Sequence, residues 1–194
     1  MVVAITGGIG SGKSSVIKEF GKFDNVVIYV ADKEAKRIMT TSPVVREKLL
    51  TAFGNESFID GQLNREFLAD LVFNDPSKLA QINAIVHPEV FKDLKGFISK
   101  NKGKLILYES ALVFETGSSE LFDYVVLVSS PKEERIKRVV KRDGVSEKQV
   151  IERMSKQWPE ERKKLLSHYL LSNVDFNETI VKIKKIHNIL TEKS

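Results

Sequence analysis

A glycine-rich segment near the N-terminus constrains the fold of this chain more than any other feature. The segment GGIGSGKS (7–14) follows the apolar run VVAI (2–5), and Val16, Ile17 and Phe20 then recur at helical spacing. A strand, a glycine turn and a helix in this order are the context in which the pattern G-x-x-x-x-G-K-[ST] surrounds phosphate groups. The sequence therefore predicts a phosphate-binding loop at the end of a buried first strand.

The residue types in this loop suit that chemistry. We expect Gly8, Gly10 and Gly12 to take positive φ angles, which lets the backbone approach a ligand without a Cβ in the way. The N–H groups at a helix N-terminus attract phosphate. In this motif the lysine contacts the β- and γ-phosphates and the serine hydroxyl contacts Mg²⁺, so we expect these roles for Lys13 and Ser14. The residues expected to contact the polyphosphate are Gly8, Ile9, Gly10, Ser11, Gly12, Lys13, Ser14 and Ser15.

Four further apolar runs indicate strands, at 25–30, 104–108, 124–128 and, more weakly, 168–172. Stretches with helical spacing separate them, and this alternation is typical of an α/β fold with a parallel sheet. We therefore predict a three-layer sandwich with a five-stranded parallel sheet, like that of P-loop nucleoside triphosphate hydrolases.

The strand pattern is interrupted between Asn64 and Lys102. Asn64 and the pair Asp75-Pro76 predict the starts of two helices, and Pro88 predicts the start of a third. We interpret the three helices as an insert at one end of the sheet.

The net charge of +5 is concentrated in one segment. Residues 132–164 hold 12 Lys and Arg against 7 Asp and Glu. Arg135, Arg138 and Arg142 lie at i, i+3 and i+7, so they share one face of a helix. Such a helix, with a second one after the turn at Asp143-Gly144, could close over a polyphosphate as a lid. A solvated basic face and a nucleic-acid-binding surface are the alternatives.

Two carboxylates follow predicted strands, at the edge where parallel sheets bind ligands. Asp32 comes directly after the second strand. There it could take the proton of a substrate hydroxyl or hold that hydroxyl in line, or it could simply cap the next helix. Glu109 ends the third strand, where it could hold Mg²⁺ or lie in solvent. His87, which precedes Pro88, could cap a helix.

Composition narrows the function classes. The chain has no cysteine, which excludes a thiolate metal site and a cysteine nucleophile, and no apolar run approaches the roughly 18 residues that span a bilayer. We expect a cytoplasmic protein.

A GTPase would carry the guanine-binding motif N-K-x-D, and the nearest segment, SNVD (172–175), lacks the lysine. Two function classes remain possible. One is a small-molecule kinase, for example a nucleoside monophosphate kinase, and the other is a nucleotide-dependent switch that binds nucleic acid.

Six segments in order resemble the dephospho-CoA kinase family, the last enzymes of coenzyme A synthesis, and together they cover nearly the whole chain. They are TGGIGSGKSS, VADKEAKR, the pair LNREFLADLVF and INAIVHPEV, ESALVFETG, RVVKRDGVSEKQVIERMSKQ, and LLSN. The phosphate-binding loop alone is widespread, whereas the ordered combination is specific.

The resemblance implies a reaction and a set of site residues. ATP with Mg²⁺ would phosphorylate the ribose 3′-hydroxyl of dephospho-CoA, a small molecule, in a monomer or weak homo-oligomer without nucleic-acid or membrane partners. The implied catalytic residues are Lys13, Asp32 and Arg138. The implied binding residues are Arg142 and Asn173 for ATP, Ser14 and Glu109 for Mg²⁺, and Asp32, Arg65, His87 and Glu115 for the acceptor.

The resemblance also implies a division of the chain, which would be one domain in three parts. The core would comprise 1–60, 103–131 and 166–194, with an acceptor-binding insert at about 61–102 and a lid at about 132–165. Four residues depart from the family pattern: Val30 stands for the first residue of Asp-Ala-Asp, Lys36 for arginine, Ala111 for proline and His168 for aspartate.

Overall fold

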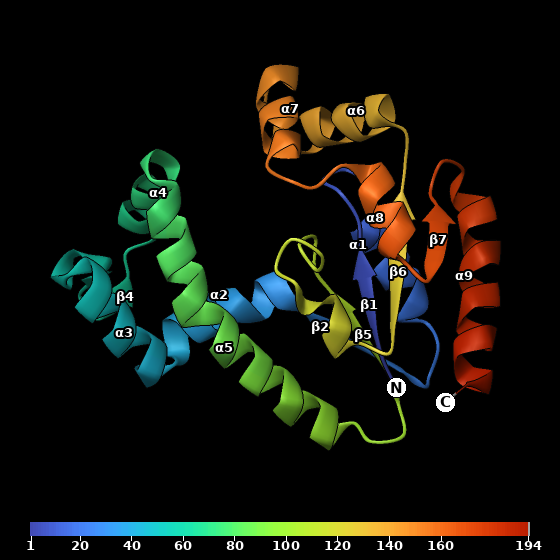
Figure 1. Ribbon diagram of the computed structural model, residues 1–194, viewed down its shortest axis with the longest axis horizontal. Coiled ribbons are helices and arrows are strands. Elements are labelled where there is room, and N and C mark those ends of the chain that lie inside the picture. The colour runs from blue at the N-terminus through green and yellow to red at the C-terminus, as the bar shows by residue number, and fades with distance from the viewer. Residues whose placement is uncertain (194) are drawn as a thin grey trace. The chain divides into compact units, whose positions relative to one another are not determined.

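The computed structural model describes residues 1–193, which divide into two compact units. One unit comprises Met1–Tyr29 and the chain from Asn101 onward, and the other comprises Val30–Lys100. The first holds the sheet, and the second is mainly helical (Figure 1). Within residues 1–193, no helix combines the length and the apolar character needed to cross a membrane.

The sheet has five strands in the order β2-β5-β1-β6-β7. The strands are β1 (Val2–Thr6), β2 (Val26–Val30), β5 (Leu105–Glu109), β6 (Tyr124–Ser129) and β7 (Tyr169–Ser172). β1 pairs in parallel with β5 and β6, and β6 pairs in parallel with β7. The five-stranded parallel sheet predicted from the sequence is confirmed. Because β1 is central, the loop that follows it lies between neighbours on both sides, where such sheets bind ligands.

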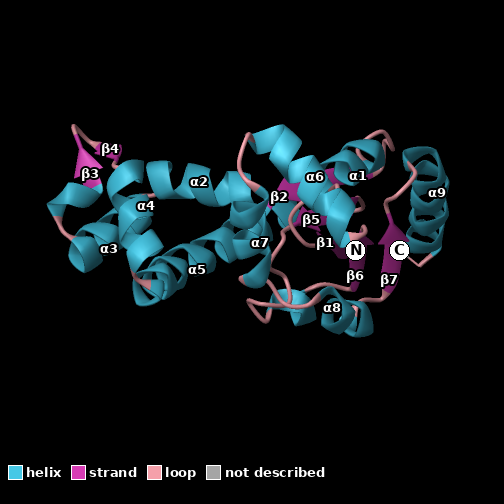
Figure 2. Ribbon diagram, turned by 90° about the horizontal axis from the view of Figure 1, so that it is seen from above, coloured by secondary structure: helices cyan, strands magenta, loops and turns pink. Residues whose placement is uncertain are grey.

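Helices cover both faces of this sheet, which explains the continuous apolar runs of its strands. Val3 and Ile5 are fully buried against α1 (Lys13–Phe20) and α9 (Phe176–Glu192). Figure 2 shows α1 and α9 on one side of the sheet and α8 (Glu160–Leu166) on the other. The predicted three-layer arrangement is therefore confirmed.

The basic segment begins with two helices, α6 (Lys132–Asp143) and α7 (Glu147–Ser155). Gly144 ends α6 in the left-handed conformation, with φ 67°, which a side chain would disfavour. Ser146 and Gln149 then form a capping box that starts α7. The turn predicted at Asp143-Gly144 is thus confirmed.

A short 3₁₀ helix, η2 (Ser118–Leu121), precedes β6.

The second unit is built around the long helix α5, against which the other helices pack. Its elements are α2 (Ala31–Thr41), α3 (Pro43–Phe53), the 3₁₀ helix η1 (Asn55–Ser57), the hairpin of β3 (Phe58–Ile59) and β4 (Gln62–Leu63), α4 (Arg65–Asn74) and α5 (Pro76–Lys100). This unit begins at Val30, whereas the sequence analysis placed the start of the insert near residue 61. The difference arises because α2 and α3 also pack on α5.

The prediction that Pro88 opens a new helix is wrong. α5 runs continuously through Pro88 from residue 76 to residue 100. Proline lacks the N–H that would bond to the preceding turn, which by itself weakens a helix interior. A row of buried side chains on both sides of Pro88, which includes Val86 and Val90, holds the helix together instead.

Candidate active site

The glycine-rich loop joins β1 to α1 as predicted, but its strained positions differ. Gly7, Gly10 and Gly12 have φ angles of 150°, 78° and 89°. The expected positive φ at Gly8 is therefore wrong, and Gly7 takes that role. A Cβ on Gly8 would lie 2.1 Å from a guanidinium nitrogen of Arg135, so a side chain there would displace this guanidinium.

Lys13 begins α1 and folds back over the loop. Its Nζ donates to the carbonyl oxygen of Gly7 at 2.8 Å and to that of Gly8 at 3.4 Å. The first N–H groups of α1 have no partner within the helix and point out of its N-terminus. The ammonium group and the helix N-terminus together form a site for a polyanion.

Asn173 supports the loop from the end of β7. Its side chain is almost completely buried; Nδ2 donates to the carbonyl oxygen of Ser11 at 2.8 Å, and Oδ1 accepts from the Thr179 hydroxyl at 3.2 Å. A Cβ on Gly12 would lie 2.0 Å from Nδ2. The close approach of Asn173 and the positive φ together leave only glycine at position 12.

Arg138 reaches the same corner of the site from α6. Its Nη1 donates to the Ser130 hydroxyl at 2.9 Å, and its Nη2 donates to the backbone oxygen of Asn173 at 3.0 Å. The guanidinium lies 3.6 Å from the Cβ position of Gly12. The structure thus brings Arg138, Asn173 and the loop together.

Arg142, one turn further along α6, is held by its neighbour. Its Nε and Nη2 donate to the two carboxylate oxygens of Asp143 at 2.7 and 3.1 Å, and Arg153 donates to the same carboxylate at 3.0 Å. Hydrogen bonding to Asp143 raises the pKa of Arg142, and the hydrogen bond with Arg142 lowers the pKa of Asp143. Arg142 therefore lies in an exposed ion pair at the end of α6.

Arg135 contacts the loop, although sequence reasoning had not assigned it to the site. It is only 9% exposed; its Nε donates to the backbone oxygen of Ile9 at 2.9 Å, and its Nη1 pairs with Glu160 at 2.8 Å. The signal available in the sequence was the face it shares with Arg138.

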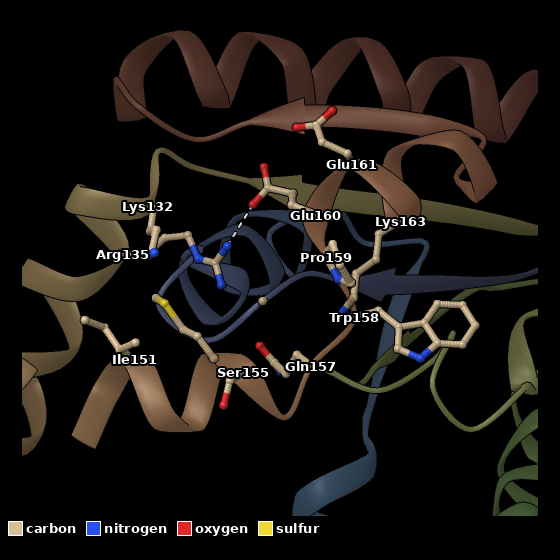
Figure 3. A pocket seen from close by; sticks show the side chains of 12 residues that line it. Lys132, Arg135, Ile151, Ser155, Gln157, Trp158, Pro159, Glu160, Glu161 and Lys163 are labelled. Atoms are coloured by element: carbon tan, nitrogen blue, oxygen red, sulfur yellow. Dashed lines mark hydrogen bonds and ion pairs between the residues drawn. The ribbon is translucent and has the colours of Figure 1, made fainter. Parts of the chain in front are cut away.

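A cavity of about 630 Å³ lies between the loop, α6, α7 and α8, and Figure 3 shows the side chains that line it, with the Arg135–Glu160 pair on one wall. Gln157, which follows α7, also lines it, and its Oε1 accepts the N–H of Ile9 at 2.9 Å. Sequence reasoning missed Gln157 as well, because nothing in the local pattern links it to the loop.

The two predicted Mg²⁺ ligands lie on different elements, one at the start of a helix and one at the end of a strand. Ser14 is exposed in the first turn of α1, and Glu109 ends β5 in register with Ile5, just before the loop. In the described part of the chain, no three His, Cys, Asp or Glu side chains form a group that could hold a metal ion. One hydroxyl and one carboxylate would be enough protein ligands for Mg²⁺, because that ion takes few protein ligands and binds substrate phosphates.

Glu115, expected at the acceptor, contacts the junction between the basic segment and the core. Its Oε1 pairs with Lys163 Nζ at 2.6 Å and accepts the N–H of Trp158 at 2.9 Å. Lys163 is only 1% exposed, so the ion pair is buried. The Arg162 guanidinium lies 3.4 Å from the centre of the Trp158 ring, which is a cation–π contact.

The remaining predicted site residues lie in the helical unit. Asp32 is exposed in the first turn of α2, but the N-cap is Val30, so Asp32 is not the helix cap. Arg65 is exposed at the start of α4, where Asn64 caps the helix as predicted. His87 lies inside α5, so the helix-cap alternative is wrong, and burial lowers its pKa.

With this geometry in place, comparisons with known proteins identify the family. The family described as dephospho-CoA kinase matches residues 1–178. The chain belongs to the dephospho-CoA kinase family. A dephospho-CoA kinase of Bacteroides fragilis is 34% identical, with 98% of this chain and 93% of the relative covered. One of Salinibacter ruber is 37% identical, with 88% and 87% covered.

A solved structure matches the fold over the whole chain. The crystal structure of TT1252 from Thermus thermophilus matches with a TM-score of 0.86 and 34% identity, covering 100% of this chain and 98% of that one. Two departures from the family pattern can be placed in the structure. Val30 is the N-cap of α2 without a side-chain capping bond, and His168 Nδ1 accepts the N–H of Val125 at 3.1 Å.

Proposed function

We propose that this chain transfers the γ-phosphoryl group of ATP to the ribose 3′-hydroxyl of dephospho-CoA and releases coenzyme A and ADP. One observation carries the proposal. A complete phosphate-binding loop, supported by Asn173 and approached by Lys13 and Arg138, lies at the carboxyl edge of the sheet in a member of this family.

The donor half of the site is assigned to the sheet unit. Residues 8–15 of the loop, through those backbone N–H groups that do not already donate within the protein, and the Lys13 ammonium bind the ATP phosphates, and Arg138 stabilises charge that develops on the transferred group. Arg142 adds a second cation on the same face once it leaves Asp143. Ser14 and Glu109 hold Mg²⁺, which neutralises charge on the phosphate oxygens when bound.

The acceptor half is assigned to the helical unit. The 3′-oxygen forms a bond to phosphorus while the bond to the ADP oxygen breaks, and the hydroxyl proton passes to Asp32. Arg65, exposed at a helix start, and His87, kept neutral by burial, contribute to acceptor binding. Glu115 acts through Lys163 and Trp158, which its carboxylate holds in place.

The test is an ADP-release assay with ATP, Mg²⁺ and a panel of acceptors. We expect turnover with dephospho-CoA, a product phosphorylated at the 3′-oxygen by NMR, and loss of turnover in the matched Lys13→Ala enzyme. Preference for AMP, CMP or UMP would instead indicate a nucleoside monophosphate kinase. Hydrolysis stimulated by DNA without transfer would indicate a nucleic-acid-dependent switch.

The proposal extends to the state of the enzyme in the cell. We propose a cytoplasmic monomer or weak homo-oligomer that needs no nucleic-acid or membrane partner. The partners of Arg135 and Arg138 support the absence of a nucleic-acid partner, because both arginines are turned toward the phosphate-binding loop and the strand ends. Sedimentation at several concentrations, with and without DNA, tests both points.

A further inference from the structure

Two side chains from outside the loop hold the backbone of Ile9. Gln157 Oε1 accepts the Ile9 N–H at 2.9 Å, and Arg135 Nε donates to the Ile9 carbonyl oxygen at 2.9 Å. Ile9 lies between Gly8 and Gly10, and glycine has more backbone freedom than any other residue. These two bonds therefore fix the part of the loop that its own sequence leaves most flexible.

Gln157 is itself well anchored. Its backbone N–H donates to the Met154 oxygen at 3.0 Å, and the next N–H, that of Trp158, donates to Glu115. Glu115 is ion-paired with the buried Lys163. The backbone on both sides of Gln157 is thus tied down, so its side chain is presented to Ile9 by a rigid support.

Arg135 is anchored in a similar way. Glu160, its partner, also accepts a hydrogen bond from the Ser129 hydroxyl at the end of β6. The two supports of Ile9 therefore come from different segments, one before α8 and one on α6. Removing one of them leaves the other in place, which makes the role of Gln157 separable from the folding of the loop.

We propose that Gln157 is a positioning residue for phosphoryl transfer, which acts by fixing the Ile9 backbone. Donors that are already oriented stabilise the transition state without having to be ordered during the reaction. A loop that samples several conformations loses part of that advantage in turnover. The kinetic part of this inference rests on the proposed function, whereas the structural part does not.

Three variants isolate the contact. Gln157→Met keeps the length of the side chain and removes the acceptor, and Gln157→Glu keeps an acceptor oxygen beside the cationic Arg135. Gln149→Met is the matched control, because Gln149 accepts its hydrogen bonds from Ser146 at the start of α7. It perturbs α7 at the end that lies away from Gln157.

The first readout is hydrogen exchange of the Ile9 amide, followed by NMR in the ligand-free full chain. We expect exchange to accelerate about ten-fold in Gln157→Met, the loss of one net hydrogen bond, and to stay slow in Gln157→Glu and Gln149→Met. Unchanged exchange in Gln157→Met would overturn the proposal. Equal acceleration in Gln149→Met would also overturn it, since that would mean a general loosening of α7.

The second readout is steady-state kinetics. We expect kcat to fall about ten-fold in Gln157→Met with the KM for dephospho-CoA unchanged, and to recover in Gln157→Glu. Faster Ile9 exchange with an unchanged kcat would refute the positioning role. A wild-type enzyme that does not phosphorylate dephospho-CoA would refute the proposed function instead, and the exchange experiment would still decide whether Gln157 holds Ile9.

Discussion

The Asn173 side-chain amide donates to the Ser11 carbonyl oxygen at 2.8 Å, and this bond ties the end of β7 to the phosphate-binding loop. The two residues are far apart in the sequence, and neither the loop motif nor the strand pattern predicts the bond. The contact joins the strand that precedes α9 to the loop that precedes α1, two helices that pack together on the sheet. Asn173 is therefore a structural support of the loop, and in the proposed function it also contacts ATP.

Asn173→Asp tests both roles with almost no change in the size of the side chain. A carboxylate cannot donate to the Ser11 oxygen, and a negative charge there opposes the ATP phosphates. We expect the free energy of unfolding to fall by about 1–3 kcal/mol, the cost of an unsatisfied buried group, and the KM for ATP to rise about ten-fold or more. Urea unfolding and initial rates measure these. Asn177→Asp, exposed in the first turn of α9, is the control and should be silent; an unchanged ATP KM in Asn173→Asp would remove Asn173 from the site.

Arg138 and Arg142 share one helix face in the sequence analysis, but they have different partners in the structure. Arg138 contacts Ser130 and Asn173 beside the loop, whereas Arg142 pairs with Asp143 in solvent. Methionine keeps the length of the side chain and removes the guanidinium. We expect Arg138→Met to lower kcat about 100-fold or more, the scale of a lost charge-stabilising donor, and Arg142→Met to have the smaller effect. Rapid-quench measurement of the transfer step compares them directly. The reverse order would show that Arg142 leaves Asp143 and is the main contact in the closed state.

The strands were predictable from the sequence because burial on both sheet faces requires continuous β-branched runs, such as YVVLV before the basic segment. Two elements were not. The 58–63 hairpin has strands of two residues, too short to show alternation, and α3 carries no strong periodic pattern. Pro88 misled the prediction because the stability of α5 comes from packing along Val86 and Val90, which a local rule for proline does not include.

In the site, the loop itself was predictable because its function fixes glycine, lysine and serine at set spacings. Its supports were not. Arg135 and Gln157 contact Ile9 only because α6 and the end of α7 pack against the loop, and helical spacing does not show which arginine points inward. Glu115 was assigned to the acceptor, yet in the structure its Oε1 pairs with Lys163, which lies almost 50 residues further along the chain.

A departure from the family pattern provides a stability test. Val30 is the N-cap of α2 and makes no side-chain capping bond, where the family pattern has aspartate. An aspartate there can accept an N–H of the first turn and complement the helix dipole. We expect Val30→Asp to stabilise the protein by about 0.5–1 kcal/mol in urea unfolding. Val30→Ala, which also removes the branched side chain but cannot cap, is the reference, and equal stability of the two variants would contradict the capping argument.

His87 makes a pH-dependent contribution to stability. Burial lowers its pKa in the folded state below the ordinary value of 6.5, so between these two pKa values the unfolded chain binds more protons. Stability from this group is complete above pH 6.5 and falls as the pH drops below that value, until the folded-state pKa is passed. We expect the loss of unfolding free energy between pH 7.5 and 5.5 to be smaller in His87→Gln than in the wild type. A steeper slope in His87→Gln would contradict the sign.

Asp32 is the residue on which the proposed chemistry depends most. It lies two residues after β2, and because Val30 occupies the cap position of α2, capping does not account for the carboxylate at position 32. Asp32→Asn is nearly isosteric and cannot take the hydroxyl proton. We expect it to bind ATP and dephospho-CoA normally and to lose about 100-fold or more in the transfer step, the scale of a positioned base. The transfer step is measured by rapid quench at saturating substrates, with Asp24→Asn, exposed before β2, as the matched control. An undiminished rate of the transfer step in Asp32→Asn would show that Asp32 is not the base. Glu109 would then be the candidate, and Glu109→Gln should lower the rate of that step.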